Sequence, residues 1–258
     1  MGNESPTWGK TGNGIGRGRC VYRVASSDGS GPARNLTERF DFNVYSCTVN
    51  DIQGLPATTP PVWSNDGKSL YFQVSHHGST VLKSVSLEGE LHAVIDNAGA
   101  VLAFSLDRLQ SKLTYFHADL KNLGQILVRN LSTGRSRRLT RFNQNLLQAI
   151  NLGEIEEVWF KGAANNDLQE WMLKPPDFDP SERYPSILEV HGGPFVQYGS
   201  LFMHAFYYLA AQGYVVYFCN PRSGQGYGEA HAKATWNNWG TVDYEDLIDW
   251  VDFVQQKP

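Results

Sequence analysis

Four consecutive residues, His191, Gly192, Gly193 and Pro194, follow an apolar run and could hold a backbone amide against a ligand. Adjacent glycines reach dihedral angles that are closed to other residues, and they leave their N–H groups unshielded. Such an N–H can donate to an oxygen that becomes negative during acyl transfer, and losing one donor costs about 3 kcal/mol of activation free energy. We therefore predict Gly193 as an oxyanion-hole donor, with Pro194 fixing the backbone beyond it. The alternative is a tight turn that binds no ligand.

Residues 155–173 are predicted to form a hairpin ahead of Pro175 and Pro176, and strands and helices then alternate around this turn. Runs of β-branched and aromatic residues predict strands at 155–160, 168–173, 186–190 and 214–219. Apolar residues at helical spacing predict helices at 201–212 and 243–256. This alternation is typical of a mainly parallel sheet covered on both faces, in which ligands bind at the carboxyl ends of the strands. Gly193 follows such an end.

Residues 1–153 have a different pattern, with short strands between turn residues and no long helical stripe. Strands are predicted at 70–74, 81–85, 113–116 and 125–128. The segment from Pro61 resembles the one from Leu102, and residues 89–94 resemble 134–139, at offsets of roughly 41 to 45 residues. The segment from Arg34 likewise resembles the segment from Arg137, which indicates a third copy of the strand-turn-strand end of the repeating unit.

A repeat of this length with about four strands per unit is typical of propeller blades. We therefore predict a partial β-propeller of about three blades in residues 1–153. Residues 154–258 are predicted to form the N-terminal part of an α/β-hydrolase sheet. A β-sandwich with coincidental internal similarity is the alternative for the first part.

His191 lies where a histidine is readily taken for a general base. In α/β-hydrolases, however, the catalytic histidine follows the serine and the acidic residue along the chain, so His191 comes too early. We expect His191 to shape the site through a hydrogen bond, with Gly192 and Pro194 supporting the loop. The other six histidines are assigned no role in catalysis.

The composition excludes several other classes of function. The chain has 258 residues, 41% of them hydrophobic, and a formal net charge of −4, which gives no basic field for nucleic acid or a membrane surface. No apolar run is long enough to span a bilayer, and the first residues have no secretory signal. We therefore expect no nucleic-acid partner, no membrane partner and a cytoplasmic location.

The titratable residues outside the turn do not suggest a metal or a cofactor. Cys20, Cys47 and Cys219 are odd in number and far apart, which favours neither a disulfide framework nor a zinc site. The acidic residues of the run at 243–252 alternate with apolar ones at helical spacing, so we expect most of them to face water. No metal and no cofactor are predicted.

Three segments in order, at 184–199, 209–228 and 239–254, resemble the prolyl oligopeptidase family of serine peptidases, and most closely its acylaminoacyl-peptidase and dipeptidyl-peptidase-like branch. The resemblance implies an N-terminal propeller joined to an α/β-hydrolase domain that cleaves short peptides or acylated N-termini. It implies an oxyanion donor in the loop that contains Gly193. The family usually has Arg-Gly-Ser where this chain has Arg222, Ser223 and Gly224.

A second departure from the family concerns the nucleophile. The family carries its serine in a Gly-x-Ser-x-Gly elbow after the next strand, followed by the acidic residue and the histidine. No such pentapeptide occurs in these 258 residues. We therefore expect that the nucleophilic serine, the aspartate and the histidine are not in this chain, that it is an internal fragment of a longer enzyme, and that it is inactive alone.

Two other functions remain open from the sequence. A carboxylesterase uses the same kind of loop on esters, although a propeller is unusual in that class. A non-catalytic protein could use its propeller to bind a peptide or another partner. The expected substrate of the peptidase is a short peptide, and the sequence does not predict an oligomeric state.

Overall fold

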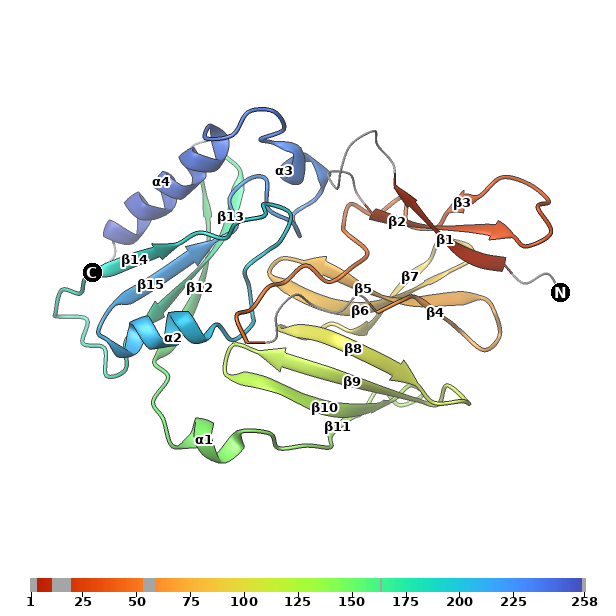
Figure 1. The fold of residues 1–258 in the computed structure, drawn as a ribbon, viewed down its shortest axis with the longest axis horizontal. Coiled ribbons are helices and arrows are strands. Elements are labelled where there is room, and N and C mark those ends of the chain that lie inside the picture. Colours follow the sequence, from red (N-terminus) through yellow and green to blue (C-terminus); the bar gives the residue numbers. More distant parts are fainter. Residues whose placement is uncertain (1–3, 11–19, 53–58, 163, 257–258) are drawn as a thin grey trace.

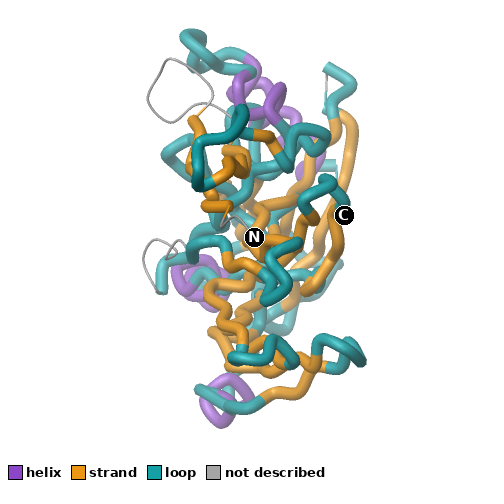
Figure 2. Tube along the Cα trace, turned by 90° about the vertical axis from the view of Figure 1, so that its right-hand side faces the viewer, coloured by secondary structure: helices purple, strands orange, loops and turns teal. Residues whose placement is uncertain are grey.

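The structure is a computed structural model that describes residues 4–10, 20–52, 59–162 and 164–256. Figure 1 shows β1–β11 on one side of the molecule and β12–β15, with α2 and α4, on the other. Turned by 90°, the strands run through the centre and the helices lie toward the outside (Figure 2).

The β-rich part contains two sheets. The smaller has the order β1 (Glu4–Lys10), β2 (Cys20–Ser26) and β3 (Arg34–Asn35). The larger contains β4 (Val62–Trp63), β5 (Ser69–His76), β6 (Ser79–Ser86), β7 (Leu91–Ile95), β8 (Ala100–Leu106), β9 (Lys112–Asp119), β10 (Asn122–Asn130) and β11 (Ser136–Arg138). Strands β6 and β8 meet only through the parallel pair Thr80 and Ala100, so the larger sheet consists of two groups of four antiparallel strands.

The internal repeat is visible in the hydrogen bonds made by the residues that directly follow β3 and β11. In the first copy, Leu36 N donates to Tyr22 O at 2.9 Å and Tyr22 N donates to Thr37 Oγ1 at 3.1 Å. In the later copy, Leu139 N donates to Ile126 O at 2.8 Å and Ile126 N donates to Thr140 Oγ1 at 2.9 Å. The recurring Leu-Thr pair therefore closes the end of a strand in the same way in both places.

Two features of this part differ from the prediction. None of the sheets closes on itself within the described residues, so a propeller is not confirmed. Residues 1–153 also include a short helix, α1 (Gln144–Gln148), in a stretch that we expected to contain only strands. Its five residues are too few to show a helical stripe.

The second part is built on the four-stranded sheet β12-β13-β15-β14. Its strands are β12 (Glu154–Lys161), β13 (Asp167–Lys174), β14 (Ser186–Glu189) and β15 (Val215–Cys219). The two strands that alternate with helices, β14 and β15, pair in parallel as predicted, whereas the pairs β12–β13 and β13–β15 are antiparallel, so the whole sheet is mixed. Strands β12 and β13 form the predicted hairpin, and such a hairpin is necessarily antiparallel.

Helices cover both faces of this sheet, as the alternation of strands and helices predicts. They are α2 (His204–Ala211) and α4 (Val242–Gln255), whereas the short helix α3 (Glu229–Lys233) lies in the segment between β15 and α4. Trp171 and Phe218 pack with Phe206 of α2, whereas Met172 and Tyr217 pack in the cluster around Trp250 of α4. Neighbouring residues along a strand point to opposite faces, which is why both strands are almost wholly apolar.

Two aspartates of the β-rich part bind helix N-termini of the second part. The side chain of Asp51 accepts hydrogen bonds from the backbone N–H groups of His204 and Ala205, both at 2.7 Å. Asp41 accepts one from the N–H of Glu229 at 2.8 Å. Free N–H groups at a helix start need such acceptors, and a nearby carboxylate also complements the helix dipole. The two parts are therefore joined by specific polar contacts.

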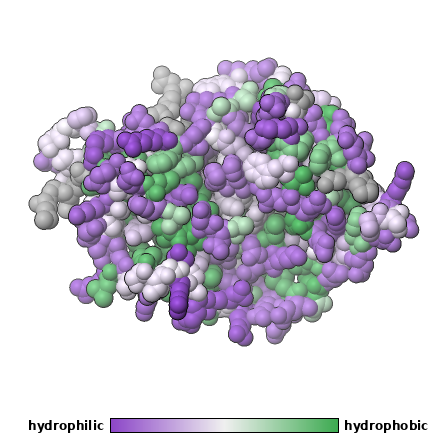
Figure 3. All heavy atoms as spheres, turned by 180° about the vertical axis from the view of Figure 1, so that it is seen from behind, coloured by the Kyte–Doolittle hydropathy of each residue, from purple (hydrophilic) through white to green (hydrophobic). Residues whose placement is uncertain are grey.

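The surface is mixed in character. Seen from behind, hydrophobic residues form separate small areas between hydrophilic ones (Figure 3). Among the described residues, no helix has the length and apolar character needed to cross a membrane.

Candidate active site

The loop that begins at His191 follows the carboxyl end of β14, as predicted. Gly193 has a φ of +128°, a region that side-chain-bearing residues rarely adopt. A Cβ at this position would lie 3.2 Å from Phe195 N and 3.3 Å from Val196 Cγ2. By contrast, a Cβ at Gly192 would meet no atom within 4 Å. The loop therefore requires glycine at position 193 and only tolerates it at position 192.

The direction of the Gly193 amide follows from its peptide plane. The only cis peptide bond in the described residues is the one between Gly193 and Pro194, so the bond from Gly192 to Gly193 is trans. The carbonyl oxygen of Gly192 lies 3.2 Å from His191 Nδ1. In a trans peptide the N–H points opposite to the carbonyl, so the Gly193 N–H points away from the imidazole. Gly193 is exposed, and none of the described residues accepts a hydrogen bond from its amide.

Asn220 holds His191 in place. It follows β15, is 1% exposed, and its Oδ1 lies 3.1 Å from His191 Nε2. The amide orientation of Asn220 is fixed, because Oδ1 accepts from Tyr198 N at 2.8 Å and Nδ2 donates to Tyr198 O at 2.9 Å. Both ring nitrogens of His191 therefore face acceptors. Burial lowers the pKa of His191 and favours the neutral ring, which donates to one of the two acceptors.

The network continues from Asn220 across the sheet. Asn220 Nδ2 donates to the hydroxyl of Tyr227 at 2.9 Å, and this hydroxyl donates to Gln169 Oε1 at 2.7 Å. Gln169 Nε2 in turn donates to Glu157 Oε1 at 2.8 Å. Burial raises the pKa of Tyr227 well above its usual value, so the phenol stays protonated and can donate. Asn220 is not among the site residues predicted from the sequence, although its position directly after a buried strand was a signal that could have indicated it.

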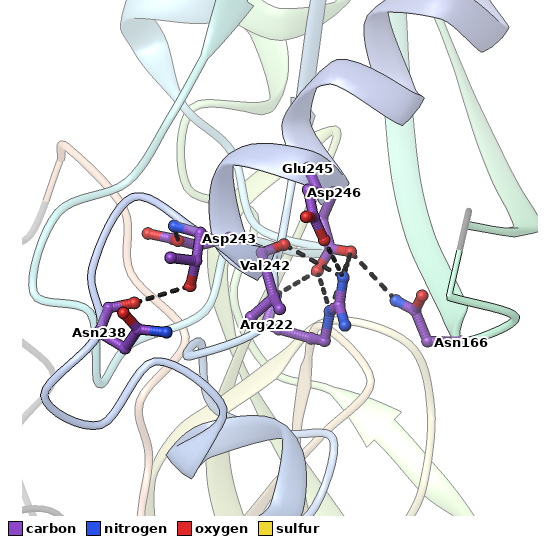
Figure 4. Close-up of polar contacts among 8 residues, drawn as sticks. Asn166, Arg222, Asn238, Val242, Asp243, Glu245 and Asp246 are labelled. Atoms are coloured by element: carbon purple, nitrogen blue, oxygen red, sulfur yellow. Dashed lines mark hydrogen bonds and ion pairs between the residues drawn. The ribbon is translucent and has the colours of Figure 1, made fainter.

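A second anchor joins the loop after β15 to α4. Arg222 and Asp246 form a bidentate pair, with Arg222 Nη2 2.7 Å from Asp246 Oδ1 and Arg222 Nε 2.9 Å from Oδ2 (Figure 4). Asp246 is fully buried and also accepts from Arg222 N at 2.8 Å and from Asn166 Nδ2 at 3.2 Å. Asp246 is therefore an exception among the acidic residues of this helix, most of which we expected to face water; Glu245 and Asp252 are exposed. The partner of Asp246 lies 24 residues earlier, beyond the reach of helical spacing.

The residue after this arginine is held in an unusual conformation. Ser223 has a φ of +104° and is 3% exposed, and its N–H donates to His231 O at 2.8 Å. The resemblance described above implies glycine at this position, and glycine adopts such angles without steric cost. The backbone therefore keeps a glycine-like shape although the residue is serine.

We expect Ser223→Gly to stabilise the chain by about 1 kcal/mol. Relief of backbone strain contributes about 1–3 kcal/mol, and the greater freedom of glycine in the unfolded chain offsets part of it. The free energy of unfolding from urea titrations measures the effect. Ser223→Ala is the matched control, since it removes the hydroxyl but keeps the strain. Equal stabilities of the glycine and alanine variants would contradict the assignment of strain.

His231 packs against the same loop and gives the structure a dependence on pH. Its Nε2 donates to Pro221 O at 3.0 Å, and its ring lies 4.9 Å from that of Tyr227. Burial lowers the pKa of His231 to about 4. The folded state therefore excludes a proton that the unfolded chain binds below about pH 6.5.

Stability should accordingly fall as the pH drops from about 6.5 to 4, and the His231 contribution to this loss is about 3 kcal/mol. His231→Gln, whose amide can still donate to Pro221 O, should lose less stability across this range when unfolding is followed in urea at pH 7 and at pH 4.5. His92→Gln, at an exposed histidine of β7, is the control and should behave as the parent chain does. A His231→Gln variant as acid-sensitive as the parent would exclude this role.

No cation site accompanies these residues. Within the described ranges, no group of three or more His, Cys, Asp or Glu side chains is arranged to hold a metal ion. The site therefore consists of a backbone amide that points away from its own sheet and of the side chains that fix it.

Sequence comparisons identify relatives of known family. Residues 200–258 match the profile of the prolyl oligopeptidase family, directly after the candidate loop. The uncharacterized peptidase YuxL of Bacillus subtilis (strain 168) is 27% identical over 218 residues, which are 84% of this chain and 33% of that protein. Dipeptidyl-peptidase 5 of Arthroderma otae is 30% identical over 238 residues, which are 89% of this chain and 30% of that protein. The chain thus spans about a third of the length of these curated relatives.

Solved structures show the same fold. An acylaminoacyl peptidase of Pyrococcus horikoshii superposes with a TM-score of 0.80 at 21% identity, over 99% of this chain and 37% of that one. Dipeptidyl peptidase 4 of Porphyromonas gingivalis gives a TM-score of 0.72 at 19% identity, over 93% of this chain and 33% of that one. The structural similarity shows a shared fold that includes an α/β-hydrolase domain. The profile match over residues 200–258 and the similarity to named peptidases place this part of the chain in the prolyl oligopeptidase family.

Proposed function

We propose that these residues form the oxyanion loop and the β-rich part of a serine peptidase that cleaves short peptides or releases acylated or free N-terminal residues. The observation that carries the proposal is the Gly193 amide, which is exposed, unbonded among the described residues and directed away from His191. A preorganised donor of this kind stabilises the oxygen that becomes negative when a nucleophile attacks a carbonyl.

The choice of a peptide substrate draws on the relatives. The similar proteins include a dipeptidyl-peptidase and an acylaminoacyl peptidase, and one similar structure is an acylaminoacyl peptidase in complex with Z-Gly-Gly-Phe-chloromethyl ketone. We propose that the sheets of residues 1–153 are blades of a propeller that restricts access to the site. In this proposal, residues 154–258 belong to the hydrolase domain.

The nucleophile is the part of the reaction that these residues do not supply. An oxyanion donor accelerates acyl transfer only if a nucleophile attacks the carbonyl. Since the 258 residues contain no Gly-x-Ser-x-Gly elbow, we propose that the serine, the acidic residue and the histidine come from a further segment. The 258-residue chain by itself should not hydrolyse peptides.

The assay compares this chain with a protein in which it is joined to a segment that carries the elbow. Both are incubated with acyl-aminoacyl and aminoacyl chromogenic substrates, with and without a serine-directed phosphonate. We expect hydrolysis only by the joined protein, and we expect the phosphonate to abolish it. Hydrolysis by the joined protein that the phosphonate does not block would refute the serine-peptidase mechanism.

The glycine pair offers a matched test of the donor. In the joined protein, Gly193→Ala should lower kcat by about 100-fold, because a Cβ at φ +128° forces the amide out of position. Gly192→Ala places its Cβ in open space and should change kcat little. Equal kcat values for the two variants would remove Gly193 from the mechanism.

A further inference from the structure

Gln197 lies four residues after Gly193, and its side chain forms hydrogen bonds with residues of the β-rich part. The residue is fully buried. Its Nε2 donates to Thr48 Oγ1 at 2.6 Å and to the carbonyl of Ser79 at 3.0 Å. Its Oε1 accepts from the N–H of Gly78 at 3.2 Å. Both side-chain donors and the acceptor of Gln197 are therefore used by residues that lie far away in the sequence.

The backbone of Gln197 is held by the same part of the molecule. Its N–H donates to Cys47 O at 2.9 Å, and its carbonyl accepts from Val49 N at 3.0 Å. These bonds make Thr48 and Gln197 an isolated parallel β-bridge between the two parts of the chain. A one-residue shift of the loop would therefore break five hydrogen bonds.

The turn between β5 and β6 closes around this contact. Gly78 O accepts from Ser200 N at 2.9 Å, and His77 N donates to Gly226 O at 3.1 Å. A Cβ on Gly78 would come within 2.6 Å of Trp171, so the turn fits against the hydrolase sheet only with glycine there. The tip of one hairpin of the β-rich part thus packs tightly against the second part.

Little freedom remains between this anchor and Gly193. Val196 N donates to Pro194 O at 2.8 Å, and Val196 O accepts from Gln225 N at 3.0 Å. At its other end, the loop is fixed by the contact between His191 and Asn220. The loop is therefore clamped at one end by its own sheet and at the other by the β-rich part.

We propose that Gln197 is a positioning residue through which the β5–β6 turn and the Thr48 segment set the direction of the Gly193 N–H. This inference rests on the proposed function of Gly193 as an oxyanion donor. It gives the β-rich part a role in catalysis beyond restricting access, because loss of its contact to Gln197 reorients a group that binds the reacting oxygen. An oxyanion donor acts only when it is held close to its productive geometry.

The test uses the ¹⁵N-labelled 258-residue chain and its amide NMR spectrum. Gln197→Met keeps the shape of the side chain and removes its three hydrogen bonds. The matched control is Gln73→Met, because Gln73 is 2% exposed and its side chain bonds to Val101 O at 2.6 Å and to Thr59 N at 3.4 Å, both within the β-rich part. Thr48→Val is a milder variant that removes only one partner of Gln197.

We expect Gln197→Met to shift the Gly192 and Gly193 amide resonances and to raise the hydrogen-exchange rate of Val49 N, which bonds to Gln197 O, by about tenfold or more. Thr48→Val should move the same resonances in the same direction by less, and it serves if Gln197→Met does not fold. Gln73→Met should leave them in place. Unchanged Gly193 resonances in Gln197→Met or Thr48→Val, or equal shifts in Gln73→Met, would overturn the proposal.

This readout does not depend on activity. A shifted Gly193 amide in a joined protein that proves inactive would uphold the positioning by Gln197 and refute only the proposed reaction. If the joined protein is active but its Gly193 amide resonance does not move in Gln197→Met, the proposed reaction is upheld and the positioning by Gln197 is refuted.

Discussion

Arg222→Met should destabilise the chain by about 3–5 kcal/mol. The substitution keeps most of the aliphatic volume but leaves the carboxylate of Asp246 fully buried without its cationic partner. An uncompensated buried charge has a cost of this size, whereas the net contribution of the intact pair is much smaller. The free energy of unfolding from urea titration at pH 7 gives the value.

Two further variants separate the buried charge from other effects. Arg222→Met combined with Asp246→Asn should recover a large part of the loss, because no unpaired charge remains. Lys161→Met breaks a pair with Asp167 in which both side chains are more than half exposed, so its effect should stay below about 1 kcal/mol. A loss in Arg222→Met no larger than that in Lys161→Met would show that the buried pair does not anchor this loop.

Trp171→Ala should cost a similar amount, about 3–5 kcal/mol. Trp171 is fully buried on the face of the sheet that α2 covers, and its ring stacks on Phe218 with centroids 5.5 Å apart. It also contacts the turn at Gly78, so its removal opens a cavity between the two parts of the molecule. Thermal and urea unfolding should both show the loss.

The control for this prediction keeps an aromatic ring. Trp171→Phe retains the stacking on Phe218 and removes an indole N–H that has no hydrogen-bond partner among the described residues, so its cost should be much smaller. Trp239→Ala, at a tryptophan that is 54% exposed, should change stability by about 0.5 kcal/mol or less. If Trp171→Ala were as mild as Trp239→Ala, the packing between the two parts would not support the fold as described.

Strands and the internal repeat were predictable because their signals are local. The apolar run at 70–74 lies within β5, and the run at 214–219 contains the whole of β15, which begins one residue later than predicted. The alternation of strands and helices predicted a sheet with helices on both faces. A buried strand needs side chains that pack on one or both faces, and these side chains belong to consecutive residues, so the pattern can be recognised within a short stretch of sequence.

Helix starts and long-range anchors were less predictable. Helix α2 begins at His204 rather than at residue 201, because Leu201 is buried in another contact and the first N–H groups are satisfied by Asp51. That cap comes from 153 residues earlier in the chain. The contacts of Asn220 and Gln197 could not be predicted for the same reason, because their partners lie far away in the sequence and come together only in the folded chain.

The loop itself is an intermediate case. Two glycines before a proline predicted an unusual backbone, and Gly193 has one. The type of residue could not tell which glycine needs the positive φ, since that depends on Phe195 and Val196. Its role as an oxyanion donor stays a prediction that the structure makes testable.

Hydrogen exchange at the Gly193 amide, followed by NMR in the 258-residue chain, tests this account most directly. Gly193 N–H should exchange at nearly the rate of an unstructured peptide, while the Tyr198 N–H of the same loop, which is bonded to Asn220 Oδ1, should be strongly protected. Protection of the Gly193 amide equal to that of Tyr198 would contradict the account, because an amide already bonded within the protein cannot serve a reacting oxygen.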